Sequence, residues 1–283
     1  MDIQILAVPY DSGHRGLRMG AGPEALLKGG LVEALHNAGH NVHVRVAELD
    51  PSRWQAEIQS SFELMRMLAT AVREAVDASR LPIILAGNCN TAVGTLAGLG
   101  TGSTGVAWFD AHADFNTPET TTSGFLDGTA VAIITGRCWT QLTTTVPGFS
   151  PVHDERVCLI GTRDIDSLES ALLDDSAVAV VGPRQLRDKL RPALHTMNEH
   201  VDRIYVHLDL DVVDSTIAAA NTFAVSGGLT TGDIEYSLSE IGQVFQIAGL
   251  ALTAYDPTAD TNGSAADVAI RLISSAANLA RKT

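Results

Sequence analysis

Apolar residues recur along this chain in short runs and in longer runs at helical spacing. The short runs are typical of strands, and they cover residues 3–9, 42–46, 81–86, 106–109, 157–161, 177–181, 204–210 and 247–255. The longer runs predict helices, which cover residues 23–39, 55–78, 91–100, 183–200 and 265–281. Predicted strands and helices therefore alternate along the chain.

Most of the predicted strands are too apolar for a sheet that has one face in water. Strands buried on both faces belong to a largely parallel sheet that helices cover on each side. No linker rich in serine, proline or glycine divides the chain, and no repeat of fixed period is visible. The pattern thus predicts an α/β fold in which residues 1–283 form a single domain.

The most informative side chains stand where the strand over residues 106–109 ends. Asp110, His112 and Asp114 follow it at spacing two. Alternation along a strand would put the three on one side, and even a frayed strand end would concentrate them. A lone Asp-x-Asp is more often a turn cap, but acid-rich ends after two buried strands, one with a central histidine, favour a metal site.

The second acid pair, Asp209 and Asp211, ends the predicted strand over residues 204–210. Two strands that end in this way could deliver all five ligands to one pocket. Mixed carboxylate and imidazole ligands favour Mn, Zn, Fe or Ni over Ca or Mg. We interpret the nearby His207 as a core or supporting residue, and the glycine-rich loop over residues 16–22 as a plain connection, because its spacing matches no phosphate-binding motif.

Composition narrows the range of partners and compartments. With 33 acidic and 19 basic residues the formal net charge is -14, so the chain offers no basic surface for nucleic acid or an anionic membrane. Cys89, Cys138 and Cys158 are too widely spaced for a disulfide framework or a Cys-x-x-Cys zinc motif. Together with an N-terminus unlike a leader and no apolar run of membrane-spanning length, this predicts a cytoplasmic protein.

Residues 108–118, Trp-Phe-Asp-Ala-His-Ala-Asp-Phe-Asn-Thr-Pro, closely resemble the arginase-type motif of the ureohydrolase family. Residues 209–211 look like the second signature of that family, and the likeness runs from the first predicted strand to Pro257. The resemblance implies a three-layer α/β/α fold and two Mn ions, bridged by a hydroxide that attacks a guanidinium carbon. It also implies a homo-oligomer, a trimer or a hexamer.

The same resemblance implies which residues hold the ions. These are Asp110 and Asp209 as bridges, His112 and Asp211 at one ion, and Asp114 and Cys89 at the other. Cys89 stands where the family has a histidine. Either its thiolate is a softer ligand that favours Zn or another later metal, or Cys89 is a small buried hydrophobe and the second ion is weak or absent.

Arginases that recognise a free α-amino acid hold its head group with loop residues after the histidine motif and with acids after the next strand. The residues that match this pattern here are Asn116, Thr121, Ser123, Asp166 and Glu169. Asn and Ser can donate to a carboxylate, whereas Asp or Glu pairs with an ammonium. An arginine-like head group is therefore favoured over agmatine, unless the loop bonds only to its own backbone.

Two further positions depart from the family pattern. Asp127 stands where the family has a proton-shuttling histidine, and an Asp could take that role only with a raised pKa. Ala254 stands where the family has the glutamate that holds the guanidinium. The motif leaves open whether Tyr255 or Asp256 replaces that contact.

The leading hypothesis is a metal-dependent hydrolase that uses two Mn ions, or one ion or another divalent metal. It would cleave a linear C–N bond of an arginine-like guanidino or N-hydroxyguanidino amino acid, releasing urea or a substituted urea. One alternative is a catalytically impaired ligand-binding or regulatory protein of the same fold. Another is a hydrolase of a different amide or formimino substrate.

Overall fold

The computed structural model describes residues 1–52 and 56–281, and its centre is one eight-stranded sheet in which every neighbouring pair is parallel. In spatial order its strands are β4 (Asn41–Val46), β1 (Asp2–Val8), β5 (Leu81–Ala86), β10 (Gln246–Thr253), β9 (Arg203–Asp209), β6 (Thr104–Phe109), β7 (Val157–Ile160) and β8 (Ala179–Val181). A short antiparallel pair, β2 (Tyr10–Asp11) and β3 (His14–Arg15), follows β1.

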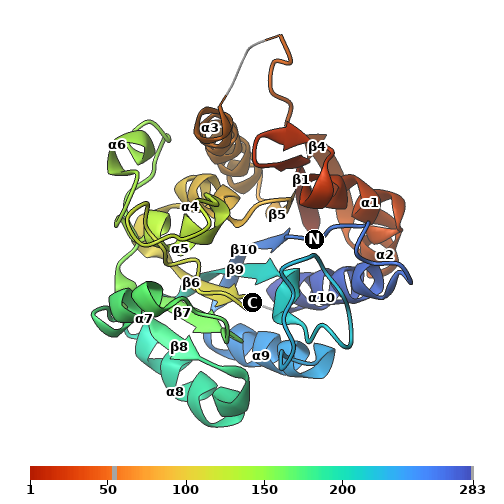
Figure 1. The fold of residues 1–283 in the computed structure, drawn as a ribbon. Helices are drawn as coiled ribbons and strands as arrows, with labels where there is room; N and C mark the ends of the chain where they lie inside the picture. Colours follow the sequence, from red (N-terminus) through yellow and green to blue (C-terminus); the bar gives the residue numbers. More distant parts are fainter. Residues whose placement is uncertain (53–55, 282–283) are drawn as a thin grey trace.

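Helices cover both faces of this sheet, so the fold has three layers (Figure 1). One face carries α3 (Glu57–Asp77), α4 (Ala92–Leu99) and α5 (Ala130–Ile134), with α6 (Thr140–Thr143) and α7 (Ser167–Asp174) nearby. The other carries α1 (Gly22–Lys28), α2 (Leu31–Asn37), α8 (Leu186–Asn198), α9 (Thr231–Val244) and α10 (Ser264–Ala280). The predicted α/β/α class with a mostly parallel sheet is confirmed.

Burial on both faces explains the continuous apolar runs. Every residue of β5 is buried, and successive side chains enter opposite layers because side chains alternate along a strand. Ile83 and Leu85 join the core beneath α1 and α10, whereas Ile84 and Ala86 join the core beneath α3 and α4. Within the described ranges, no helix is both long and apolar enough to cross a bilayer.

The predicted helix over residues 23–39 is wrong in one respect, because two helices stand there. Between α1 and α2, Gly30 has a φ of 99°, which glycine adopts readily and which interrupts a helix. The apolar pattern also does not predict α7 and α9, both of which start with a capping box. Gln55, the predicted first residue of the next helix, lies outside the described residues, and α3 begins at Glu57.

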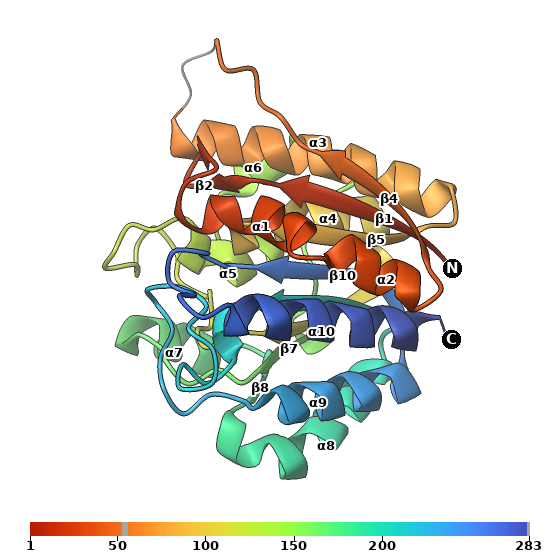
Figure 2. The same ribbon diagram turned by 90° about the vertical axis from the view of Figure 1, so that its right-hand side faces the viewer.

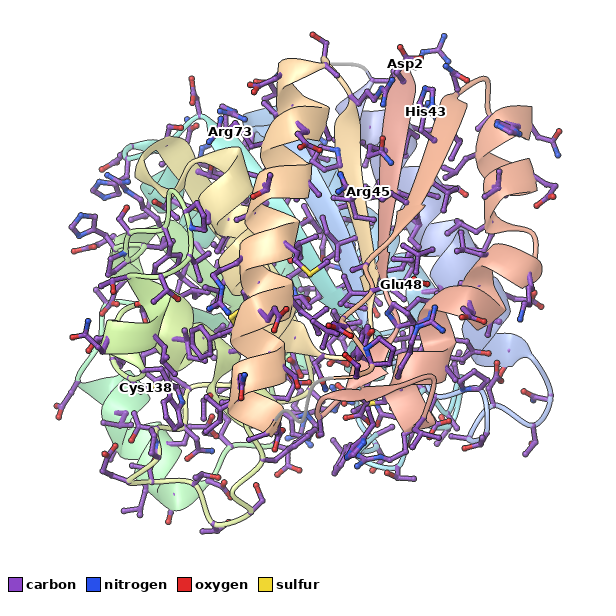
Figure 3. All side chains as sticks on the ribbon, turned by 90° about the horizontal axis from the view of Figure 1, so that it is seen from above. Asp2, His43, Arg45, Glu48, Arg73 and Cys138 are labelled. Atoms are coloured by element: carbon purple, nitrogen blue, oxygen red, sulfur yellow. The ribbon has the colours of Figure 1, made fainter. Side chains whose placement is uncertain are left out.

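Strand β4 forms one exposed edge of the sheet. Figure 3 shows His43 and Arg45 on this edge, and Arg45 Nη1 lies 2.8 Å from Glu74 Oε2 on α3. Charged side chains along an exposed edge oppose pairing with another strand. The edge therefore belongs to the solvent-facing surface, away from the strand ends described next.

Four central strands end side by side and position the chemistry. In the order β5-β10-β9-β6, their last residues are Ala86, Thr253, Asp209 and Phe109. Thr253 is in register with Asp209, and Phe109 with Leu208. Figure 2 shows the arrows of β1 and β10 pointing away from the chain termini, toward the side where long loops gather. Parallel sheets bind ligands at this edge.

Candidate functional site

Potential ligand atoms meet in two groups at this edge of the sheet. Asp110, His112 and Asp211 form one group, and Cys89, Asp110 and Asp209 form the other. In each group the ligand atoms lie within 4.8 Å of one another, and Asp110 belongs to both. The fold thus brings together five of the six residues that the sequence predicts as ligands.

Asp114, the sixth predicted ligand, is buried and faces the same pocket, although neither of the two groups found among the described residues includes it. Its φ of 50° shows that strand geometry does not continue through the motif after Phe109. The Asp114 carbonyl accepts hydrogen bonds from the backbone N–H groups of Val131 and Ala132, at 2.8 and 3.2 Å. These bonds tie the frayed strand end to α5.

Hydrogen bonds hold the central carboxylates in place. Asp110 accepts from the His112 backbone N–H at 2.7 Å and from Trp108 Nε1 at 3.0 Å. Asp209 Oδ1 accepts from the Asp211 backbone N–H at 2.9 Å. His112 Nδ1 lies 3.3 Å from Asp110 Oδ1 and 3.4 Å from Asp211 Oδ2. At the end of each strand, the backbone N–H two residues further on therefore donates to the first acid and fixes its orientation.

The electrostatics of these groups fit a bound cation. Burial, followed by the charge of Asp211, raises the pKa of Asp110 to about 6, and burial also raises the pKa of Asp209 well above its usual range. Burial opposes charge on His112, but the hydrogen bond to Asp110 and the charge of Asp211 outweigh it and raise its pKa to about 9. Buried carboxylates this close need positive charge among them, and carboxylate plus imidazole suits a divalent metal.

Cys89 is held in the second group by the turn that follows β5. Its Sγ donates to Asp209 Oδ2 at 3.0 Å and lies 3.1 Å from Thr253 Oγ1. Burial, followed by the charge of Asp209, raises the pKa of the thiol well above its ordinary value. The thiol form therefore dominates unless a cation replaces the proton, because a metal ligand must be the thiolate.

His207 lies in the core beneath the site, which agrees with its predicted supporting role. Its ring stacks on Trp108 with centroids 3.6 Å apart, and its Nε2 lies 3.1 Å from Thr253 Oγ1. Burial lowers the pKa of His207 to about 3, so the ring is neutral. The stack supports Trp108, which in turn donates to Asp110.

A cavity of about 370 Å³ opens above these groups. Besides the ligands, its walls contain the predicted head-group residues and several residues that the sequence analysis does not single out. The predicted head-group residues are Asn116, Thr121, Ser123, Asp166 and Glu169, and the walls also contain Ala254 and the predicted proton carrier, Asp127. The additional residues include Arg18, Phe125, Asp164, Asn221 and Phe223.

The predicted head-group loop is partly engaged with itself. Asn116 Nδ2 donates to Asp166 Oδ2 at 3.2 Å, and Asn116 Oδ1 accepts from Thr120 Oγ1 at 2.9 Å. Thr121 Oγ1 and Ser123 Oγ accept from the backbone N–H groups of Gly124 and Phe125. Thr121 Oγ1 also lies 3.4 Å from Ser123 Oγ. Each hydroxyl has one proton to donate, so one donates to the other and the second keeps its proton for the pocket.

Glu169 is buried and has both carboxylate oxygens occupied. Oε1 accepts from the Phe115 backbone N–H at 2.7 Å, and Oε2 accepts from the Asp166 backbone N–H at 3.1 Å. The second bond is half of a capping box at the start of α7. Glu169 thus connects α7 to the metal-ligand loop, and Asp166 is the more open acid of the pair.

Asp127 is anchored by two donors from the turn that carries Cys89. Its Oδ2 accepts from Asn88 Nδ2 and its Oδ1 from the Asn90 backbone N–H, both at 2.9 Å. Burial outweighs these hydrogen bonds and raises the pKa of Asp127 to about 7. A raised pKa of this kind is what proton transfer by Asp127 would require.

Neither suggested replacement for the guanidinium-binding glutamate is among the described residues that line the cavity. The Tyr255 hydroxyl donates to Asp260, and Asp256 Oδ1 accepts from the backbone and hydroxyl of Thr258. Ala254 itself faces the cavity, and Asn221 Nδ2 donates to its carbonyl at 2.8 Å. The pocket therefore has a methyl group where the glutamate is expected.

Comparison with known proteins identifies the family of the chain. The family model for the arginase family matches residues 1–278. An arginase from Bacillus caldovelox is 29% identical, covering 96% of this chain and 97% of its own, and its solved structure superposes with a TM-score of 0.87 at 27% identity and 97% coverage of both chains. An arginase from Brucella melitensis is also 29% identical, with 97% and 95% covered. The predicted hydrolase class is confirmed, and the chain belongs to the arginase family.

Proposed function

We propose that the protein hydrolyses a linear C–N bond of an arginine-like guanidino or N-hydroxyguanidino amino acid at a pair of Mn ions. The products are urea or a substituted urea and an amine. The observation that carries this proposal is the pair of ligand groups that share Asp110 at the floor of a cavity lined by Asn116, Ser123 and Asp166.

The two ligand groups suit two divalent ions. His112, Asp211 and Asp110 would hold one ion, and Cys89, Asp114, Asp209 and Asp110 the other. Divalent ions supply acidified water and stabilise negative charge that develops in a hydrolytic transition state. The chain's own contribution is to fix the carboxylates through backbone hydrogen bonds and to bury them away from bulk water.

The remaining residues divide between the substrate head group and proton transfer. Asp166 pairs with the substrate ammonium, while the hydroxyl of the Thr121–Ser123 pair that keeps its proton donates to the substrate carboxylate. Asp127 carries a proton to the leaving amine, which suits a group with a pKa of about 7.

A second candidate activity is favoured by Ala254. With a methyl group at this place, the cavity also suits a formimino or other amide substrate that does not need a carboxylate partner for a guanidinium. A substrate panel with separate readouts for urea, formamide and amine distinguishes the two activities.

The test of the leading proposal is urea release from L-arginine and N-hydroxy-L-arginine by protein loaded with Mn. We expect turnover in the natural chain and loss of turnover in Asp110→Asn, which weakens a ligand common to both groups. Asp188→Asn, an exposed change on α8, serves as the matched control. Equal activity of the Asp110→Asn variant and the natural chain would contradict the proposal.

We also propose a cytoplasmic location, one domain over residues 1–283, and a homotrimer or homohexamer. The three cysteines are free and buried, which suits a reducing compartment. Light scattering of the purified protein tests the assembly.

A further inference from the structure

One arginine side chain lines a cavity whose walls are mostly acidic. Among the described residues that line it, Arg18 is the only lysine or arginine, against seven aspartates and glutamates. The side chain of Arg18 is 51% exposed, so it lies on the open side of the pocket rather than at the buried floor. A substrate that carries a carboxylate meets repulsion in such a cavity unless a cation receives it.

The backbone around Arg18 is set by close packing. A Cβ on Gly20 would lie 2.9 Å from the Asp11 backbone nitrogen, and one on Gly22 would lie 2.2 Å from the Tyr255 carbonyl oxygen. Arg18 itself has a φ of 47°, a left-handed conformation that costs a residue with a side chain about 1 kcal/mol or more. The tightly packed loop thus holds Arg18 in an unfavourable conformation that directs it to the cavity.

The guanidinium is positioned but retains free donors. Arg18 Nε lies 3.3 Å from Asp11 Oδ2, and its Cζ lies 5.9 and 5.6 Å from the ring centroids of Phe125 and Phe223. These two rings stack on each other with their centroids 5.6 Å apart. Within the described part of the chain, no hydrogen-bond acceptor pairs with either Nη atom of Arg18. A planar fork with two unused ends suits a carboxylate.

The neighbouring loop offers further donors on the same side. Phe125, which contacts the guanidinium, belongs to the segment that carries Thr121 and Ser123, and its backbone N–H donates to Ser123 Oγ. We propose that Arg18 binds the carboxylate of the substrate, so that the pocket selects amino acids over their decarboxylated amines. This inference rests on the proposed function, because it names the substrate class of the same site.

Binding of matched ligand pairs tests the inference without requiring turnover. L-ornithine is compared with putrescine, and L-lysine with cadaverine, by calorimetry on the metal-loaded full chain, because none of these ligands has a guanidino group to hydrolyse. The natural chain should prefer the carboxylated member of each pair. Arg18→Gln should weaken binding of that member by about 10- to 100-fold, as expected for a hydrogen bond to a charged group, and leave the amine within about twofold.

Two further variants separate recognition from folding. Arg18→Lys keeps the charge and should retain part of the preference, whereas Arg15→Gln, an arginine that bonds to Glu48 outside the cavity, should retain all of it. A natural chain without the preference, or an Arg18→Gln protein that keeps it, overturns the inference. If the binding results overturn the inference but urea release persists, the proposed function still stands. If the natural chain prefers carboxylated ligands but releases no urea, the role of Arg18 is supported and the proposed urea-releasing activity is contradicted.

Discussion

The sulfur of Cys89 lies 3.0 Å from Asp209 Oδ2, in a buried group that also contains Asp110. This contact joins one of the residues that depart from the family pattern, Cys89, to a carboxylate that matches it, Asp209. A thiol proton occupies the position between them, and a cation with both groups as ligands would displace it. Under the proposed function, the fate of this contact decides whether the second ligand group binds an ion.

Replacing Cys89 should therefore change the second ion and spare the first. Cys89→Ala should lower the affinity for the second ion by about 10-fold or more, because it removes a ligand, whereas Cys89→His should retain both ions. Titration of metal-free protein with Mn, followed by calorimetry, measures the two affinities. An unchanged second affinity in Cys89→Ala would show that the sulfur is only a packing group.

Asp127→Asn should lower kcat by about 100-fold with little change in KM, since general acid–base catalysis contributes about that much. Burial raises the pKa of Asp127 to about 7, so the rate of the natural chain should change around pH 7 as this group loses its proton. The variant should lack that inflection. A pH–rate profile from pH 5 to 9 checks both points, and the same inflection in both proteins would remove Asp127 from the mechanism.

The Arg137–Asp154 pair should stabilise the fold in a pH-dependent way. Two hydrogen bonds of 2.8 and 2.7 Å join them, and Arg137 stacks over Phe115 beside the ligand loop. The hydrogen bonds from Arg137 hold the pKa of Asp154 below its usual value. A depressed carboxyl pKa gives stability that is complete above its unfolded value, near 4, and is lost as pH falls through the folded value.

Asp154→Asn should consequently cost about 1–2 kcal/mol at pH 7. The difference from the natural chain should shrink as the pH is lowered from 5 toward 3. Urea unfolding at several pH values measures it. A difference that stays constant over this range would mean that ionisation of Asp154 contributes nothing.

Gly87 is predicted to tolerate no side chain. A Cβ there would lie 2.3 Å from the Tyr10 carbonyl oxygen and 2.8 Å from the Gly20 backbone nitrogen. Gly87→Ala should destabilise the protein by about 3 kcal/mol, because backbone must move to admit the methyl group. Gly102→Ala, where nothing lies within 4 Å, is the control, and equal urea midpoints for the two variants would contradict the packing argument.

Local patterns predict the sheet and most of the candidate ligands that lie together in the structure. Strands such as β5 are buried on both faces, so their composition alone reveals them. Asp110 directly follows the last residue of β6, Asp209 is the last residue of β9, and these two strands are neighbours in the parallel sheet. The left-handed turn at Asp114 lies beyond this reasoning, because it depends on backbone bonds to α5.

Other features depend on contacts that no local pattern contains. Arg18 lies in a loop that reads as a connection, and only its packing against residues 11 and 255 brings it to the cavity. Glu169 matches a head-group acid in sequence, yet the structure also gives it two backbone N–H donors. The capping boxes of α7 and α9 are visible in sequence and are the signal that could have revealed these helices.

The most direct test of the metal-centre proposal is the number of metal ions per chain. Elemental analysis of protein purified without chelator, before and after incubation with Mn, gives that number. The account predicts two ions per chain after incubation, with Cys89 and Asp209 both serving the second. One ion or none would contradict the two-ion proposal. Cys89 would then be a core residue, and the protein would be a binding protein or an enzyme with a different chemistry.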